Sequence, residues 1–263
     1  ADQVDVNLKV TEKATGNLML GVGTSSTDTV ILSGSIAQNN FLGSGNNVAI
    51  QVNSAKRYRT YVFSYTNPYF TPDGVSQGFD LYHRTVDTTS TAVAPYKSAS
   101  TGGGLRFGFP IGEKESLGFG LGLDSTTITT FDESPKYYKD FVKEFGSTNA
   151  SIPVTLNWIS DGKDSYFFPT SGTYQKAGLE VAAPGGDLTY YRATYQLQHF
   201  IPLNKKFTLM MNGEVGYADG YADKGLPFYK NFYAGGVNSV RGYKAGSLGP
   251  IDVDNGNEYR VGG

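Results

Sequence analysis

The chain has 263 residues, a formal net charge of −2 and no cysteine, and 17% of its residues are charged against about 25% in an average soluble domain. This balance gives no attraction for nucleic acid, and a chain without cysteine has no disulfides or thiolate metal sites. Its two histidines, His83 and His199, are too far apart to form a local metal pair. We therefore expect no nucleic acid, metal or cofactor among its ligands.

Hydropathy gives no sign of a membrane-spanning helix. No uncharged apolar run approaches the ~20 residues that such a helix requires. The first residues, Ala1 to Asp5, lack the basic start and apolar centre of a signal peptide, so we expect a removed signal or an internal piece of a longer chain. A strand that crosses a membrane alternates lipid-facing and inward-facing residues, so its average hydropathy is unremarkable. The alternation along the chain is therefore the informative signal.

The chain begins with a short alternating segment. Residues 4–10 alternate apolar and polar side chains, and the polar stretch 11–16 that follows ends in glycine. This pattern predicts one half-buried strand followed by a joint.

From Asn17 the period of two continues through about eleven segments and ends near Ala218. Residues 105–109 and 117–123 are the clearest, because bulky apolar residues on one face oppose mostly glycine on the other. Glycine weakens a strand unless something needs the room, so this second face suggests an interior that receives a folded segment. Later segments exceed the ~9–11 residues with which a tilted strand crosses a bilayer. The pattern predicts an all-β, antiparallel transmembrane β-barrel.

The connections between these segments differ in length. Short turns alternate with longer loops, the turns at 112–115, 184–187 and 202–205 and the loops at 87–97, 133–149 and 219–263. Outer-membrane barrels place short turns on the periplasmic side and long loops outside. Tyrosine and phenylalanine gather near segment ends, as in the aromatic girdles at membrane interfaces, although a soluble β-fold rich in aromatic residues would share this feature.

The last long loop carries the most distinctive motif. Val240, Arg241, Gly242 and Tyr243 hold one guanidinium among glycine and aromatic residues, which suggests a segment packed against other atoms. The run resembles the Val-Arg-Gly-Phe/Tyr motif of the BamA superfamily of outer-membrane β-barrel assembly and translocation proteins.

Two further stretches carry the same resemblance. Residues 64–76, with Asn-Pro-Tyr-Phe before an Asp-Gly turn, and residues 167–172, with Pro-Thr-Ser-Gly, are similar to turns of that superfamily. The similarity runs, with gaps in the loops, from about Val4 to Gly263.

The resemblance implies a domain organisation. Residues 1–15 would end the last periplasmic POTRA domain and its hinge, and residues 16–263 would form about the first eleven strands of a sixteen-strand barrel, with loop 219–263 folded into the lumen. A twelfth strand would begin near Tyr259. The later strands, which normally supply the acidic partners of Arg241, would follow Gly263, so the chain reads as a piece of a longer protein or its ordered part.

The function implied by the resemblance is insertion of β-barrel proteins into the outer membrane through a weak lateral seam. The seam strand would be residues 17–24, and its gate residues are Leu18, Leu20, Gly21, Val22 and Gly23. Unfolded outer-membrane proteins would be the substrates, and outer-membrane lipid would surround the barrel. Accessory lipoproteins of the BAM complex would be the partners of the full-length protein. Arg241→Ala would loosen the lumen loop and reduce assembly.

Two other functions stay open. A related polypeptide secretion channel, of the two-partner secretion or TamA-like kind, shares the arginine motif. A diffusion porin would need an open lumen, against which the glycine-rich loop 219–263 argues. An enzyme is not expected, because the sequence lacks the serine-hydrolase, Walker and zinc-protease motifs.

Overall fold

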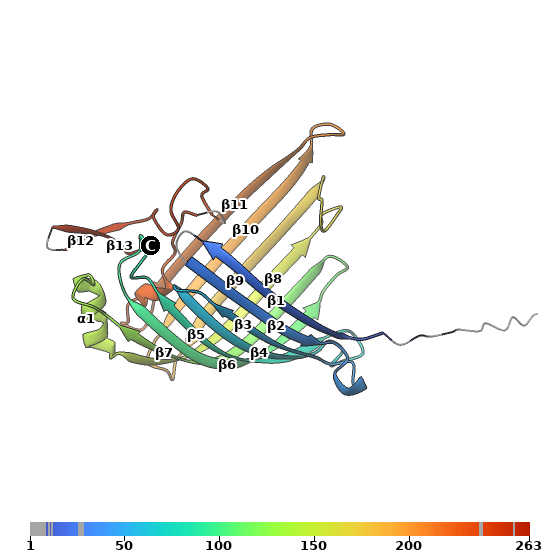
Figure 1. Ribbon diagram of the computed structural model, residues 1–263, viewed down its shortest axis with the longest axis horizontal. Helices are drawn as coiled ribbons and strands as arrows, with labels where there is room; N and C mark the ends of the chain where they lie inside the picture. Colours follow the sequence, from blue (N-terminus) through green and yellow to red (C-terminus); the bar gives the residue numbers. More distant parts are fainter. Residues whose placement is uncertain (1–8, 10, 12, 26–28, 237–238, 255) are drawn as a thin grey trace, which may run out of the picture.

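The structure is a computed structural model that describes residues 9, 11, 13–25, 29–236, 239–254 and 256–263. Its main element is one antiparallel sheet of eleven strands, each hydrogen-bonded to the next in chain order (Figure 1). The strands are Gly16–Ser25 (β1), Thr29–Gln38 (β2), Asn47–Ser54 (β3), Tyr58–Asn67 (β4), Ser76–Asp87 (β5), Lys97–Pro110 (β6), Glu115–Thr129 (β7), Thr148–Asp161 (β8), Gly172–Ala183 (β9), Tyr190–Pro202 (β10) and Thr208–Gly220 (β11). The eleven predicted segments are thus confirmed. The strand predicted over residues 4–10 falls almost wholly outside the described residues.

The register puts the two kinds of side chain on opposite faces of the sheet. Leu105 on β6 pairs with Leu121 on β7, and Gly104 pairs with Gly122, so the bulky residues align across strands and so do the small ones. The apolar face is open, with Leu105 and Leu121 48% and 46% exposed. An exposed apolar face opposite a small and polar one is the pattern of a strand that meets lipid on one side.

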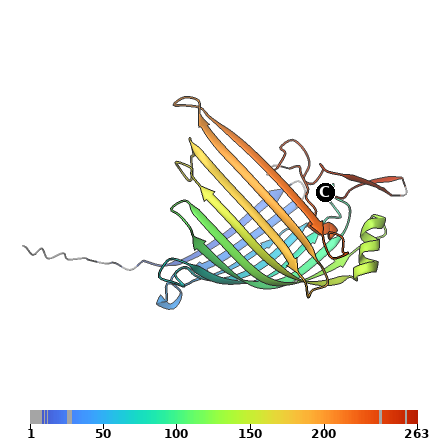
Figure 2. The same cartoon turned by 180° about the vertical axis from the view of Figure 1, so that it is seen from behind.

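The sheet is curved but not closed on itself. Figures 1 and 2, which view it from opposite sides, show β1 and β2 passing in front of the last strands in one view and behind them in the other. Among the described residues, β1 pairs only with β2 and β11 pairs only with β10. The sheet is therefore a trough with two free edges, and we call its concave side the inner face.

Strand order also decides at which end each connection lies. In an antiparallel meander, successive connections alternate between the two ends of the sheet. The turns after β6 and β10 therefore lie at the same end as the 162–171 connection after β8. Residues 184–187 follow β9 and therefore lie at the opposite end, with the long loops. Grouping 184–187 with the short turns was wrong, because the length of a turn does not reveal its end of the sheet.

The long loops build a cap at their end of the trough. The cap contains the helix Lys136–Phe145 (α1), the short 3-10 turn Phe228–Lys230 (η2), and a hairpin of Ile251–Asp254 (β12) and Asn257–Arg260 (β13). A second 3-10 turn, Phe41–Gly43 (η1), follows β2 and lies at the opposite end of the sheet. The expectation that a twelfth barrel strand begins near Tyr259 was wrong, because this residue pairs with Asp252 in that separate hairpin. No helix in the described part of the chain is long and apolar enough to cross a membrane.

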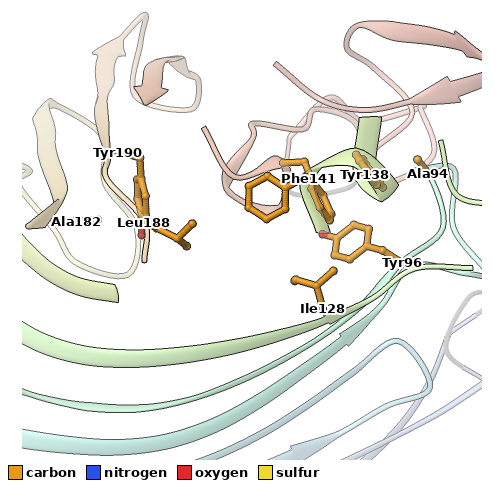
Figure 3. Packing of buried hydrophobic residues seen from close by; sticks show 9 residues of the cluster. Ala94, Tyr96, Ile128, Tyr138, Phe141, Ala182, Leu188 and Tyr190 are labelled. Carbon is orange, nitrogen blue, oxygen red and sulfur yellow. The ribbon is translucent and has the colours of Figure 1, made fainter. Parts of the chain in front are cut away.

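The hydrophobic core lies between this cap and the inner face. Figure 3 shows Tyr138 and Phe141 of α1 close to Tyr96 and Ile128. Tyr190, at the start of β10, and Leu188, just before it, belong to the same cluster. Phe228 of η2 completes the cluster, and its ring stacks on Tyr138 with centroids 3.8 Å apart. The residues of the cluster are at most 6% exposed, so they anchor cap segments that are far apart in sequence.

Candidate functional site

The free edge of β1 is the first candidate site. β1 pairs with β2 in an uninterrupted register from Gly16 opposite Gln38 to Ser25 opposite Thr29. Its other side has no partner among the described residues. A free edge presents a row of unpaired backbone N–H and C=O groups, which is a template for another strand.

The five predicted gate residues all lie in β1 and are divided between its two faces. Leu18, Leu20 and Val22 lie on the outer face, where they are 66%, 81% and 79% exposed. Gly21 and Gly23 lie on the inner face, opposite Ser33 and Ile31 of β2. The edge strand therefore combines an apolar outer surface with an inner surface that has almost no side-chain packing.

Loop 221–263 forms the second candidate site, where η2 and the residues after it lie against the inner face. Lys230 forms a 2.7 Å ion pair with Glu180 of β9, and the Tyr190 hydroxyl donates to the same carboxylate oxygen at 2.6 Å. The ring of Phe232 lies over the Arg192 guanidinium of β10, with Cζ 4.1 Å from the ring centroid. Both loop contacts fall on the wall formed by β9 and β10.

The α1 helix holds the same loop from the other side. The Tyr138 and Tyr233 hydroxyls are 3.3 Å apart, and Tyr233 donates to the Val261 carbonyl at 3.0 Å. Burial raises the pKa of Tyr138 well above its ordinary value, and the neighbouring Tyr233 hydroxyl adds to the shift. Tyr138 is therefore a neutral hydrogen-bonding group throughout the physiological pH range.

The predicted loop motif lies beyond these anchors. Val240, Arg241, Gly242 and Tyr243 are all exposed, Val240 by 40% and Tyr243 by 57%. A turn is closed by the amide of Tyr243 donating to Val240 and the amide of Gly236 donating to Tyr243. Gly242 has φ 97°, a conformation that favours glycine. Among the described residues, Arg241 has neither an ion pair nor a hydrogen bond, so its role in holding the loop stays a prediction.

Charged residues of the inner face pair within the wall only in part. Arg106 forms a 2.7 Å ion pair with Asp80 on the neighbouring strand and donates to Thr66 at 2.6 Å. Glu180 pairs with the loop, as described, and its neighbour Arg192 has a fully buried Nε without a hydrogen-bond partner in the described part of the chain. Arg106 thus pairs with a neighbouring strand, whereas Glu180 and Arg192 contact the loop.

The turn after β8 is organised by one carboxylate. Asp164 accepts hydrogen bonds from the Thr170 hydroxyl at 2.5 Å and from the amides of Thr170 and Ser171 at 2.9 and 3.1 Å. These bonds hold the pKa of Asp164 well below its ordinary value. The turn presents Phe167 and Phe168 to solvent at the end of the sheet away from the cap.

Sequence patterns did not single out Gly216, Lys230 or Phe232 as site residues. The signal was present in part, because Gly216 is a glycine on the inner face of an otherwise ordinary strand. No group of three or more His, Asp or Glu residues in the described ranges is arranged to hold a metal ion.

An antiparallel meander with an exposed apolar face and a small, polar inner face defines the class of transmembrane β-barrel proteins. The chain belongs to the Omp85 superfamily, whose domain matches residues 40–263. A solved structure of BamA from Haemophilus ducreyi lacking POTRA domains 1–3 is similar, with a TM-score of 0.85 and 29% identity over 91% of this chain and 48% of that one. CdiB from Escherichia coli, at a TM-score of 0.52 and 16% identity, shares the fold.

Curated relatives point the same way. The outer membrane protein assembly factor BamA of Neisseria meningitidis serogroup B is 39% identical over 96% of this chain, and that of Nitratidesulfovibrio vulgaris is 29% identical over 100%. The chain spans about a third of the length of each, 33% and 32%.

Proposed function

We propose that this chain acts in the assembly of β-barrel proteins in the outer membrane, as part of an insertase that offers a free strand edge to incoming strands. The similarity to two assembly factors and to a BamA structure supports the general role. The observation that carries the mechanism is the composition of β1, the first strand of the sheet, where Gly21 and Gly23 offer no side chain for cross-strand packing with Ser33 and Ile31 of β2.

The physical driving force lies in the lipid environment. In a bilayer, an unpaired backbone group costs several kcal/mol, so a free edge gains strongly by pairing with another strand. An incoming strand that adds to β1 would satisfy these groups by β-augmentation. The exchange needs only hydrogen bonds and burial, so we propose a protein without a cofactor and without covalent chemistry.

The weakness of the seam is the second part of the mechanism. Gly21 and Gly23 lack the side chains that usually stabilise cross-strand pairs, each worth about 0.2–1 kcal/mol. A strand that pairs weakly can release one partner and accept the next. Unfolded outer-membrane proteins are the proposed substrates, the outer-membrane lipid surrounds the exposed apolar face, and accessory lipoproteins act with the full-length protein.

The loop anchored at Lys230 and Phe232 argues against a porin. It occupies the inner face of β9 and β10 at the cap end of the trough, where a diffusion channel would need open space.

Reconstitution tests the proposed function. The full-length protein in liposomes should accelerate the folding of an unfolded outer-membrane barrel, measured by the appearance of protease-resistant substrate. Empty liposomes and liposomes that contain an unrelated barrel are the controls. An unchanged folding rate, with transport of a soluble polypeptide instead, would favour a secretion channel, and a large steady conductance would favour a porin.

A further inference from the structure

Phe232 has a tightly fitting place on the inner wall. A Cβ atom added to Gly216 of β11 would lie 2.6 Å from Cζ of the Phe232 ring, 2.7 Å from Cε1 and 3.1 Å from Cε2. Real Cβ atoms essentially never approach another atom so closely, so the ring rests directly on the backbone of Gly216. The Arg192 guanidinium, 4.1 Å from the ring centroid, lies against the ring from the neighbouring strand β10.

The strand itself does not require glycine at this position. Gly216 pairs with Thr194 in a regular antiparallel register, and the next inner-face residues on either side, Glu214 and Ala218, carry side chains. Gly216 has an ordinary negative φ, since it is not among the glycines with positive φ. The space above Gly216 is therefore explained by the ring of Phe232.

Arg192 adds a second independent observation. Its Nε is completely buried and has no hydrogen-bond partner among the described residues. A buried guanidinium without its full set of hydrogen bonds is costly, and the face of an aromatic ring supplies part of the missing stabilisation. Removing Phe232 would take this ring away from the Arg192 guanidinium.

The backbone of Phe232 connects this contact to the rest of the loop. Its amide donates to the Gly263 carbonyl at 2.7 Å, and the Gly263 amide donates back at 3.1 Å. Two residues later, Ala234 and Leu248 exchange backbone hydrogen bonds of 3.4 and 3.0 Å. A fixed Phe232 therefore fixes the segment that leads to the Val240–Tyr243 motif.

We propose that Gly216 and Arg192 form a seat for the Phe232 ring, and that this seat sets the position of the loop on the inner wall. Phe232 is a positioning residue, because it acts through the placement of the loop. The proposal does not depend on the assembly function, and its test reads the position of the loop directly.

The test compares the same substitution at two glycines of β11. Gly216→Ala should expel the ring, whereas Gly213→Ala is the matched control, because a Cβ there meets nothing within 4 Å. The chain contains no cysteine, so Ala234→Cys in a cysteine-free full-length protein reports on the loop. We expect Gly216→Ala to increase the maleimide labelling rate at position 234 several-fold and Gly213→Ala to leave it unchanged.

Equal labelling rates in the two glycine variants would overturn the proposal. If both rates stay low, the added Cβ at position 216 does not move the loop. If both rise, the cause is a general weakening of β11. Phe232→Leu, which alters no residue of the sheet, carries the same test if Gly216→Ala prevents folding. It should also raise labelling several-fold, and an unchanged rate would show that the ring does not position the loop.

Discussion

At the residue scale, the two glycines of β1 have different surroundings. A Cβ at Gly21 would lie 2.5 Å from the Ser33 hydroxyl oxygen, which is the end of a short, rotatable side chain. A Cβ at Gly23 would meet nothing within 4 Å. Packing within the described residues therefore does not require glycine at position 23, which agrees with a role in keeping the seam weak.

Gly23→Val tests that role. Valine favours strands, and the spread of strand propensities is about 1 kcal/mol, which corresponds to roughly a fivefold change in rate if it acts fully on seam release. We expect the full-length variant to fold normally and to assemble substrate about fivefold more slowly in the liposome assay. Gly213→Val, on the outer face of β11, is the control. Assembly at the wild-type rate would show that weak pairing at position 23 does not matter.

The Asp164 turn gives a pH prediction at the same scale. The Thr170 hydroxyl and the amides of Ser171 and Thr170 depress the pKa of this carboxyl, so its stabilisation is complete above the ordinary pKa of about 3.9 and is lost as the pH falls through the lower folded value. Thr170→Val removes one donor and should raise the pKa of Asp164, so that turn 164–171 loosens at higher pH. Amide exchange of Ser171, followed from pH 5 downward, measures this. Identical profiles for both proteins would rule out the role of Thr170.

At the element scale, the sequence predicted the sheet well and the cap poorly. A strand can be recognised from residues close together in the sequence, because every second side chain faces the same environment. The structure shows this alternation in β6 and β7. The helix α1 was read as part of a loop, since it is only ten residues long and its apolar residues pack on distant segments such as η2. Hairpin β12–β13 was missed for the same reason, because its position depends on tertiary contacts.

One of these contacts joins the hairpin to α1. The helix has no side-chain cap of its own, and its Lys136 amide donates instead to the Asp254 carboxylate of β12 at 2.9 Å. The hairpin also pairs with the loop after β5, where the Ala94 amide donates to the Arg260 carbonyl at 2.9 Å. The cap is thus tied together by contacts between elements that are each short.

Asp254→Ala should weaken this connection. Loss of a capping carboxylate costs about 0.5–2 kcal/mol, so the amides at the start of α1 should exchange faster by about two- to thirtyfold, while those of the eleven-stranded sheet keep their protection. Glu258→Ala in β13 is a control, since Glu258 is exposed and its side chain forms no hydrogen bond or ion pair with the described residues. Equal exchange in both variants would mean that Asp254 does not hold the hairpin on the helix.

At the scale of the whole molecule, one candidate site can be recognised from the sequence pattern, whereas the other depends on contacts between distant segments. The gate strand could be predicted from residues 17–24 alone, and it forms an edge of the sheet. The seat of Phe232 could not, because it joins residues of β10, β11 and the loop whose proximity no sequence period encodes. Arg241 was predicted from a motif, and its pairing with acidic residues of later barrel strands stays a prediction.

The most direct test of the central claim is to trap a substrate strand on β1 during assembly. Single cysteines at Leu18, Leu20 and Val22 should form disulfides with cysteines in the edge strand of a stalled outer-membrane substrate. Paired antiparallel strands bring opposite Cα atoms to about 4.5–5.5 Å, which lies within the range that a disulfide spans. For antiparallel pairing, each two-residue step along β1 should move the substrate partner by two residues in the opposite sense. Leu121→Cys, on the outer face of central strand β7, should form none. Disulfides without this register, or equally frequent ones at position 121, would contradict strand pairing at β1.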